Sequence, residues 1–193
     1  KWAAQEIPSY SEPEKIVFAD VDAHPNATFD INLSSAITPG SLGADHRLNG
    51  FLQKAADYKV RRDFPAVDAT SHLSSDLHFG TISPRTILEF LDHSSESGEA
   101  FIRQLAWRDW YAHLLFASPE IVDSPANPIY KAIAWRDDND DYAAWKEGQT
   151  GYPIVDAGMR ELHETGFMHN RVRMITGSFL VKHLLIDWRL GEQ

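Results

Sequence analysis

The chain has 193 residues, of which 43% are hydrophobic and 11% aromatic, and its formal net charge is −10. This apolar content suffices for one globular domain with its own core, and the negative charge argues against general affinity for nucleic acids. The absence of cysteine excludes disulfide bonds and thiolate metal sites and favours a cytoplasmic location, and the nine histidines lack the spacing of a zinc site.

Residues 1–44 contain Pro8, Pro13, Pro25 and Pro39 and show no sustained hydrophobic period. They are typical of an interdomain linker or a wrapping arm, which would precede a domain over residues 45–193. The first ten residues have no apolar core of the kind found in signal peptides. Since the chain begins with Lys1 and its last helical pattern has no stop signal, we expect it to be a piece of a longer protein.

From Ala44 onward the hydrophobic periodicity predicts about six helices and almost no strand, so the expected class is all-α. In chain order the first three are expected over residues 45–58, over 84–93 with Ser83 as N-cap, and over 97–117 with Ser97 as N-cap. Two more are expected over residues 140–147 and 153–165, the second ending at Gly166. We expect these helices to form a bundle-like arrangement.

The sixth helix is expected to run from Met168 to Trp188, and it is apolar on nearly all sides. Such a helix is normally buried. Lys182 and His183 interrupt its apolar run, so the pattern does not predict a membrane span. Asn170, Arg173 and Met174 would share one face of it. A buried Arg173 would require an anionic or richly hydrogen-bonding partner, because an unpaired buried charge costs several kcal/mol.

A cluster of hydroxyl side chains precedes the expected second helix, at Thr70, Ser71, Ser74 and Ser75. Hydroxyls and free amides at the start of a helix can hold a phosphate or a pyrophosphate. The same residues are equally typical of a capping box and a serine turn, which stabilise a helix end and bind nothing. The pattern alone leaves both interpretations open.

The expected third helix alternates the aromatic residues Phe101, Trp107, Trp110 and Tyr111 with Arg103 and Arg108. This alternation suits stacking on nucleic-acid bases with the arginines on phosphates. It equally suits a helix that packs its aromatic side chains against its neighbours. Trp135 and Trp145, further along, are ordinary candidates for core positions.

Four segments occur in the order of one known family: "RRDFPAVDATSHLS", "HFGTISPR", "AWRDWYAHLL" and the long run from Trp145 to Glu192. Together they resemble the helical FAD-binding domain of the photolyase/cryptochrome family, most closely its microbial members that act on cyclobutane pyrimidine dimers. The resemblance covers roughly residues 44–193. It implies an incomplete helical domain, with the family's amino-terminal antenna domain and the last part of the helical domain missing.

The resemblance implies FAD as cofactor and assigns residues to it. The flavin would have Arg173 beside its ring, and Asn170 between the ring and the substrate. Phe101 and Phe167 occupy positions where many relatives have tryptophan beside the cofactor. The FAD phosphates would be held by Tyr58, Thr70, Ser71, Leu73 and Ser74. An antenna chromophore is expected only in the missing amino-terminal domain.

The resemblance also implies a DNA partner with ultraviolet damage. Trp107 would stack on the flipped-out dimer and Met174 would pack against it, while phosphate or lesion-edge contacts would come from Arg62, Arg108 and Arg171. Trp188 and Trp135 match the middle and outer tryptophans of the family's electron relay. One departure is Gln104, which stands where dimer-repair members usually have glutamate; an amide cannot donate an acidic proton or carry charge.

The function implied is that of a deoxyribodipyrimidine photo-lyase, which repairs pyrimidine dimers by electron transfer from reduced FAD under light. The alternatives within the family are a cryptochrome-type blue-light receptor and a six-four photolyase, both of which Gln104 slightly favours. We expect neither a metal nor a membrane partner. The chain by itself is expected to bind FAD weakly and to be inactive, because part of the cofactor pocket would lie beyond Gln193.

Overall fold

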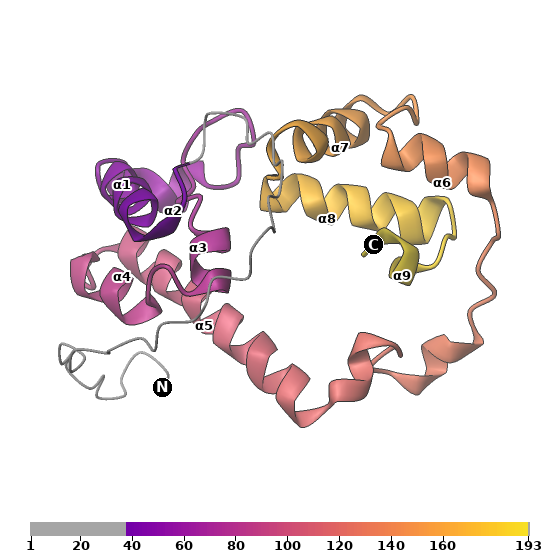
Figure 1. Cartoon of the computed structure of the whole chain (residues 1–193), viewed down its shortest axis with the longest axis horizontal. Helices are drawn as coiled ribbons and strands as arrows, with labels where there is room; N and C mark the ends of the chain where they lie inside the picture. The colour runs from indigo at the N-terminus through magenta and orange to yellow at the C-terminus, as the bar shows by residue number, and fades with distance from the viewer. Residues whose placement is uncertain (1–37, 193) are drawn as a thin grey trace, which may run out of the picture. The chain divides into compact units, whose positions relative to one another are not determined.

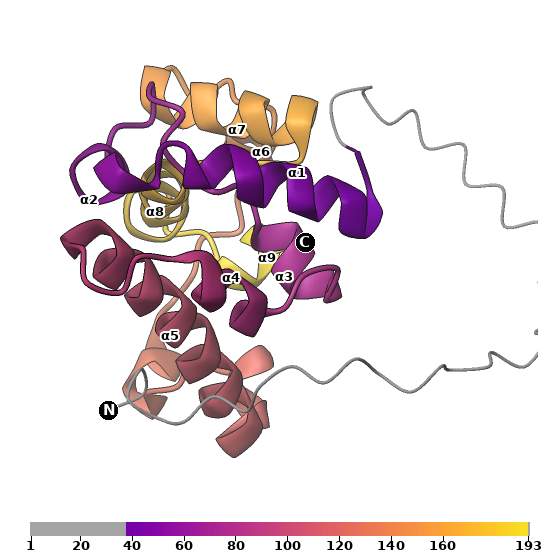
Figure 2. The ribbon, with the colours of Figure 1, turned by 90° about the vertical axis from the view of Figure 1, so that its left-hand side faces the viewer.

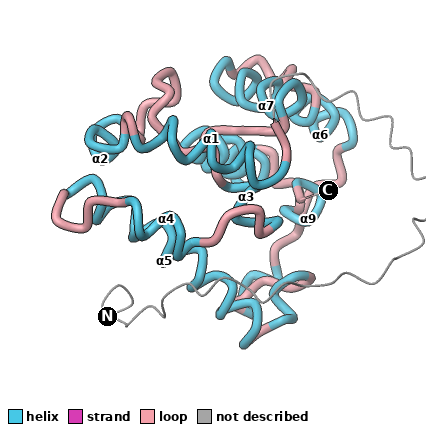
Figure 3. The backbone as a smooth tube through the Cα atoms, turned by 60° about the vertical axis from the view of Figure 1, so that its left-hand side comes forward, coloured by secondary structure: helices cyan, strands magenta, loops and turns pink. Residues whose placement is uncertain are grey.

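The computed structural model describes residues 38–192. Every regular element in this range is a helix or a helical turn (Figures 1 and 3), which confirms the all-α class for these residues. Most of the proposed linker over residues 1–44 lies outside the described residues. The chain divides into two compact units, one formed by the described parts of Lys1–Gln53 and Ser71–Asp92, the other by Lys54–Thr70 and His93–Gln193.

The first unit contains α1 (Gly40–Leu52), α3 (Ser74–Phe79) and α4 (Pro84–Phe90). Helix α1 begins before the expected boundary at residue 45, since the left-handed backbone of Gly40 (φ 76°) allows the chain to turn into the helix directly after Pro39. The Arg47 guanidinium donates two hydrogen bonds of 2.7 Å to the buried carboxylate of Asp76. This pair fastens α1 to α3, which lie against each other (Figure 2).

The start of α4 confirms one predicted cap. Ser83 precedes the helix with an extended backbone, its Oγ accepts a hydrogen bond from the Arg85 amide at 3.2 Å, and Pro84 occupies the first helical position. The core of this unit lies between the three helices. It consists of the buried side chains of Ala44, Leu48, Phe51, Leu73, Ile82, Ile87, Leu88 and Leu91.

The second unit opens with the turn η2 (Ala55–Asp57), the short helix α2 (Tyr58–Arg61) and the long helix α5 (Glu96–Ala117). The prediction that Ser97 caps α5 is wrong, because the Ser95 Oγ accepts from the Gly98 amide at 3.0 Å and is the cap. Ser97 is the second residue of the helix and is buried. Its hydroxyl donates to the Ala56 carbonyl at 2.6 Å and accepts from the Lys59 amide, so it fastens α5 to η2 and α2.

After the turns η3 (Pro119–Val122) and η4 (Pro128–Ala132), the chain forms α6 (Asn139–Lys146), α7 (Pro153–Thr165) and α8 (Asn170–Ser178). Helices α7 and α8 lie side by side (Figure 1), and Gly158 permits their close approach. The expected end of α7 at Gly166 is confirmed by its left-handed backbone, φ 69°. The core of this region is Trp145, Val155, Met159, Met168, Val172, Phe179, Leu180 and Ile186.

The single helix expected from Met168 to Trp188 is wrong. Helix α8 passes into a wider π-helical turn, η5 (Phe179–His183), and the chain then leaves the helix at Leu185, whose backbone is left-handed (φ 55°). The Ile186 amide donates to the Leu180 carbonyl, which turns the Ile186 side chain into the core. A short helix α9 (Trp188–Gly191) follows. In the described part of the chain, no helix has the length and apolarity needed to cross a membrane.

The expected burial of Arg173 is also wrong: its side chain is exposed. Helix α8 presents Val172 and Thr176 to the core, whereas Arg173, Met174 and Ile175 face outward. The reason is that α7 covers only one side of α8. An apolar periodicity that continues around a helix marks it as buried only when neighbours cover every side.

Candidate functional site

The outward face of α8 carries three of the predicted site residues. Asn170 and Met174 lie one turn apart, with 3.9 Å between the Asn170 Nδ2 and the Met174 sulfur, and both are exposed. Arg173 lies between them in sequence, and among residues 38–192 no ion pair or side-chain hydrogen bond engages its guanidinium. This face therefore offers an amide, a cation and a polarizable thioether to a ligand.

The start of α8 is held by His169, which the sequence analysis did not select. His169 is buried, its Nδ1 accepts from the Arg171 amide at 3.1 Å, and its Nε2 lies 3.0 Å from the Arg62 carbonyl. An Nδ1 that accepts places the ring proton on Nε2, which then donates to that carbonyl. Histidine is not a preferred N-cap, so the sequence held no signal for this role.

Two of the three predicted DNA-contacting arginines share one carboxylate. The Arg171 Nε donates to the Asp63 Oδ1 at 2.9 Å, and the Arg62 Nε lies 3.6 Å from the same oxygen. The hydrogen bond from Arg171 holds the pKa of Asp63 below its usual value despite partial desolvation, with the charges of Arg171 and Arg62 adding to the effect. Asp63 is not among the predicted site residues, and its only signal in the sequence is its position directly after two arginines.

Tyr58, Phe101 and Arg62 form a second contact group. The rings of Tyr58 and Phe101 meet edge to face with their centroids 5.1 Å apart, and the Arg62 guanidinium carbon lies 5.6 Å from the Tyr58 ring centroid. Both aromatic side chains are buried, and burial raises the pKa of the Tyr58 hydroxyl. Phe167 is half-buried in the loop between α7 and α8. The structure thus gathers Tyr58, Phe101 and Arg62, which the sequence assigned to two different ligands.

Helix α5 exposes an aromatic cluster formed by Trp107, Trp110 and Tyr111. Trp107 meets Trp110 edge to face at 5.4 Å between centroids, and Trp110 meets Tyr111 at 4.9 Å. Trp107 is 53% exposed and Tyr111 60% exposed, so the packing interpretation holds for Phe101 but is wrong for this cluster. Three exposed aromatic rings on one helix form a stacking surface.

Two further predicted residues flank this aromatic cluster on α5. Gln104 is half-buried one turn before Trp107, and its Nε2 donates to the Ala100 carbonyl at 3.2 Å. This bond turns the amide nitrogen back along the helix. Arg108 is exposed beside Trp107, and its Nη1 lies 3.5 Å from an Asp109 carboxylate oxygen. Arg108 therefore belongs to the α5 surface and not to the group around Asp63.

The residues predicted to hold the phosphates divide between the two units, with Tyr58 and Thr70 in the second and Ser71, Leu73 and Ser74 in the first. The Ser71 Oγ accepts from the Leu73 amide at 3.3 Å, which is the serine turn of the alternative interpretation. Leu73 is the N-cap of α3 and provides no side-chain cap, and Ser74 is exposed in the first turn. The amides of that turn therefore keep their capacity to bind an acceptor.

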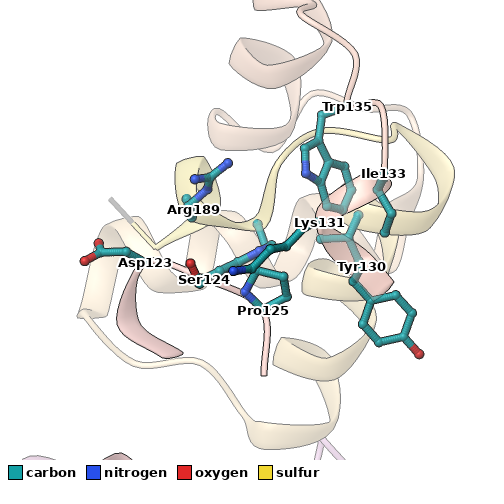
Figure 4. Close-up of a pocket in the computed structure, with 10 residues that line it drawn as sticks. Asp123, Ser124, Pro125, Tyr130, Lys131, Ile133, Trp135 and Arg189 are labelled. Carbon is teal, nitrogen blue, oxygen red and sulfur yellow. The ribbon is translucent and has the colours of Figure 1, made fainter. Parts of the chain in front are cut away.

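Trp135 and Trp188 line one pocket of about 600 Å³ in the second unit (Figure 4). Trp135 lies in the segment after η4, and Trp188 is the first residue of α9. The Arg136 amide donates a hydrogen bond to the Leu185 carbonyl at 2.8 Å, which joins these two segments. Arg189, which also lines the pocket, is paired with Asp187. Two tryptophans distant in sequence are thus brought to one place.

No metal centre is visible in residues 38–192, where no three His, Asp or Glu side chains come together in a way that could hold an ion. The hydrogen-bond donors of the site are mainly amides, hydroxyls and guanidinium groups, and the Asp63 carboxylate accepts from one of them. These donors suit phosphates and the polar edges of an aromatic heterocycle.

Comparison with known proteins yields one protein family. The family described as "FAD binding domain of DNA photolyase" matches residues 101–193. The chain is 46% identical over 160 residues to a deoxyribodipyrimidine photo-lyase of Alkalihalophilus pseudofirmus, covering 79% of this chain and 33% of that protein. It is 49% identical over 155 residues to the enzyme of the same name from Salmonella typhimurium, covering 76% and 33%.

Solved structures give the same result for the fold. A bacterial class III photolyase from Agrobacterium tumefaciens superposes with a TM-score of 0.80 at 47% identity, covering 83% of this chain and 34% of that one. A Synechocystis cryptochrome superposes with a TM-score of 0.76 at 34% identity, covering 86% and 37%. The chain spans about a third of the length of the curated relatives described above.

Proposed function

Because this chain belongs to the photolyase/cryptochrome family, as part of its helical FAD-binding domain, we propose that the full-length protein repairs cyclobutane pyrimidine dimers in DNA under light. The observation that carries the proposal is the exposed aromatic cluster of Trp107, Trp110 and Tyr111 on α5. Three exposed rings beside Arg108 provide aromatic faces and a cation on one helix. A protein that receives an unstacked base requires such a surface.

FAD fits the donors that the chain presents. A diphosphate accepts hydrogen bonds, and the uncapped first turn of α3 supplies amides together with the Ser74 hydroxyl. On α8, the Arg173 guanidinium has no partner among the described residues, and it would complement a negatively charged flavin ring. Asn170 would hydrogen-bond at the ring edge. We assign the further contacts to Tyr58, Thr70, Ser71, Leu73, Phe101 and Phe167.

Damaged DNA fits the arginines and the aromatic cluster. Trp107 would stack on the flipped-out pyrimidines, and Met174 would pack against them as a soft apolar contact. Arg62, Arg108 and Arg171 would bind phosphates or the polar edge of the lesion. Flipping costs little at a dimer, because a damaged base is already poorly stacked. These contacts give a chain of negative net charge a local surface for DNA.

Reduced FAD, when bound and excited by light, supplies the electron that opens the cyclobutane ring and receives it back afterwards. The residues of this chain orient the two partners and exclude water from between them. Trp135 and Trp188, which line one pocket, are our candidates for part of the path that brings electrons to the flavin from the surface. An antenna chromophore would bind outside this chain, and the cytoplasmic location stays a prediction.

A second function, light sensing without repair, has one observation in its favour. Gln104 replaces the glutamate expected in dimer-repair relatives, and its amide nitrogen is turned to the Ala100 carbonyl. The remaining amide oxygen can accept a hydrogen bond but provides no acidic proton. A cryptochrome or a six-four photolyase would fit this position as well.

Illumination of damaged DNA separates the three functions. Duplexes carrying one cyclobutane dimer, or one six-four product, are mixed with the flavin-reduced full-length protein, and intact pyrimidines are measured after light and after an equal time in the dark. We expect light-dependent recovery of the cyclobutane substrate alone. Recovery of the six-four substrate alone, or of neither, would remove the proposed function in favour of one of the alternatives.

A further inference from the structure

We propose that Asp63 is a specificity-determining residue, which holds Arg171 in the orientation needed for the lesion at the expense of affinity for ordinary DNA. The inference rests on the proposed function and deepens it. An acidic side chain, Asp63, lies between two arginines on the surface expected to face DNA. A carboxylate in such a place repels phosphates, so a structural reason for it is required.

The first step is the geometry of the Arg171 guanidinium. Its Nε donates to the Asp63 Oδ1 at 2.9 Å, while no described residue engages its two Nη groups. A guanidinium is planar, so fixing the Nε edge also fixes the direction of the Nη groups. Arg171 is thereby ordered before any ligand arrives, and ordering in advance removes an entropic cost from binding.

The second step is the support beneath this pair. The Arg171 amide donates to the His169 Nδ1, and His169 in turn reaches the Arg62 carbonyl at 3.0 Å. Arg62 lies against the Tyr58 ring and 3.6 Å from the same Asp63 oxygen. The backbone and side chains of the two arginines are therefore tied to one another twice, once through His169 and once through Asp63.

The third step is the charge of the group. Two arginines and one aspartate leave a single net positive charge, where two arginines alone would provide two. Affinity for undamaged DNA depends mainly on the number of positive charges near the phosphates, and Asp63 lowers it. Recognition of a lesion depends on where individual donors point, and Asp63 improves it. One side chain would thus shift the balance from affinity towards specificity.

The test compares binding of dimer-containing and undamaged duplexes to the full-length flavoprotein in the dark. Asp63→Asn should bind undamaged DNA about twofold to fivefold more tightly, since one negative charge is removed. Its preference for the dimer should fall about tenfold, the value of one well-placed charged hydrogen bond. The matched control is Asp57→Asn, whose carboxylate lies 3.8 Å from the exposed Arg61 guanidinium and has no other ion pair within residues 38–192. Asp57→Asn should bind undamaged DNA more tightly but keep the wild-type preference for the dimer.

Two further variants test the coupling. Arg171→Ala should lose the same preference, and the double variant Asp63→Asn with Arg171→Ala should lose no more than Arg171→Ala alone. Asp63→Glu keeps the charge and should restore most of the preference. An unchanged flavin spectrum verifies that each variant is folded. A preference that survives in Asp63→Asn would overturn this inference alone, whereas a wild-type protein without preference would overturn the proposed function with it.

Discussion

At the scale of single residues, Arg173 has a charged side chain that the described fold does not use. It is exposed, and no residue within 38–192 forms an ion pair with it. The sequence suggested that Arg173 needs an anionic partner because it is buried. An anionic partner for Arg173 stays a hypothesis, but the reason for it is now exposure and not burial. An exposed arginine is available to a ligand without destabilising the protein.

Arg173→Ala should therefore weaken FAD retention and leave the fold intact. A charge-assisted hydrogen bond contributes about 1.5–3 kcal/mol, which corresponds to FAD binding weaker by about one to two orders of magnitude. The free energy of unfolding of the flavin-free protein should change by less than about 0.5 kcal/mol, as for other surface positions. Equilibrium dialysis of FAD and urea denaturation give the two quantities. Arg103→Ala, an exposed arginine on α5, is the control and should alter neither.

Trp107→Ala should weaken binding of damaged DNA and leave FAD binding unchanged, in contrast to Arg173→Ala. Stacking on an unpaired base contributes about 1–3 kcal/mol, so the dark affinity for dimer-containing DNA should fall by that amount while the flavin spectrum stays unchanged. Phe116→Ala on the same helix removes a side chain that is 90% exposed and lies outside the aromatic cluster. If both variants lose affinity equally, Trp107 has no special contact with the lesion.

At the scale of helices, one tryptophan of α6 forms a hydrogen bond to the backbone of α8. Trp145 is buried in the core, and its Nε1 donates to the Thr176 carbonyl at 3.0 Å. Trp145→Phe keeps an aromatic ring but removes this hydrogen bond, while the Thr176 carbonyl still accepts from the Phe179 amide, so the free energy of unfolding should fall by about 0.5–1.5 kcal/mol. Trp110→Phe, at an exposed position, is the matched control and should be close to neutral. Urea denaturation compares the two, and equal losses would contradict this role for Trp145.

A buried carboxylate fixes the loop before α7. Burial opposes ionisation of Asp156, but hydrogen bonds from the Thr150 hydroxyl and amide and from the Gly151 amide outweigh it and lower its pKa. A folded-state pKa below the unfolded one adds stability at pH values above the unfolded pKa, about 3.9. That contribution is lost as the pH falls through the folded-state pKa.

Asp156→Asn should therefore destabilise the protein at neutral pH and have a smaller effect in acid. The difference in unfolding free energy between wild type and variant, measured in urea, should be constant near pH 7 and shrink below about pH 4. Thr150→Val removes one of the donors to the Asp156 carboxylate. It should therefore lose part of the stability at neutral pH that Asp156→Asn loses. A difference that does not depend on pH would show that the carboxylate charge does not stabilise the loop.

The sequence predicted the helical elements better than their ends and faces. The cap at Ser83 and the end at Gly166 follow from local rules and are confirmed. The break at Leu185 could not be predicted, because it depends on the Ile186 side chain reaching the core. The exposed face of α8 could not be predicted either, because apolar residues occur all around the helix. Their periodicity does not show which sides of the helix are covered by neighbours.

At the scale of the whole molecule, the family resemblance assigns roles to single residues but does not show which side chains contact one another. The resemblance assigned Arg62, Arg108 and Arg171 together to DNA, whereas the structure joins Arg62 and Arg171 through Asp63 and His169 and has Arg108 beside Asp109 on α5. The resemblance assigned Trp135 and Trp188 to one electron relay, but only the structure shows that they line one pocket. Such groupings arise from contacts between residues far apart in sequence, so no local pattern records them.

The most direct test of light-driven repair is the emission lifetime of the reduced, protein-bound flavin. If the excited flavin gives its electron to a dimer that the protein holds against it, the lifetime in the full-length protein should shorten when DNA containing a cyclobutane dimer is added. It should stay unchanged with undamaged DNA of the same sequence. An equal lifetime with both DNAs, under conditions where the damaged DNA is bound, would contradict the account.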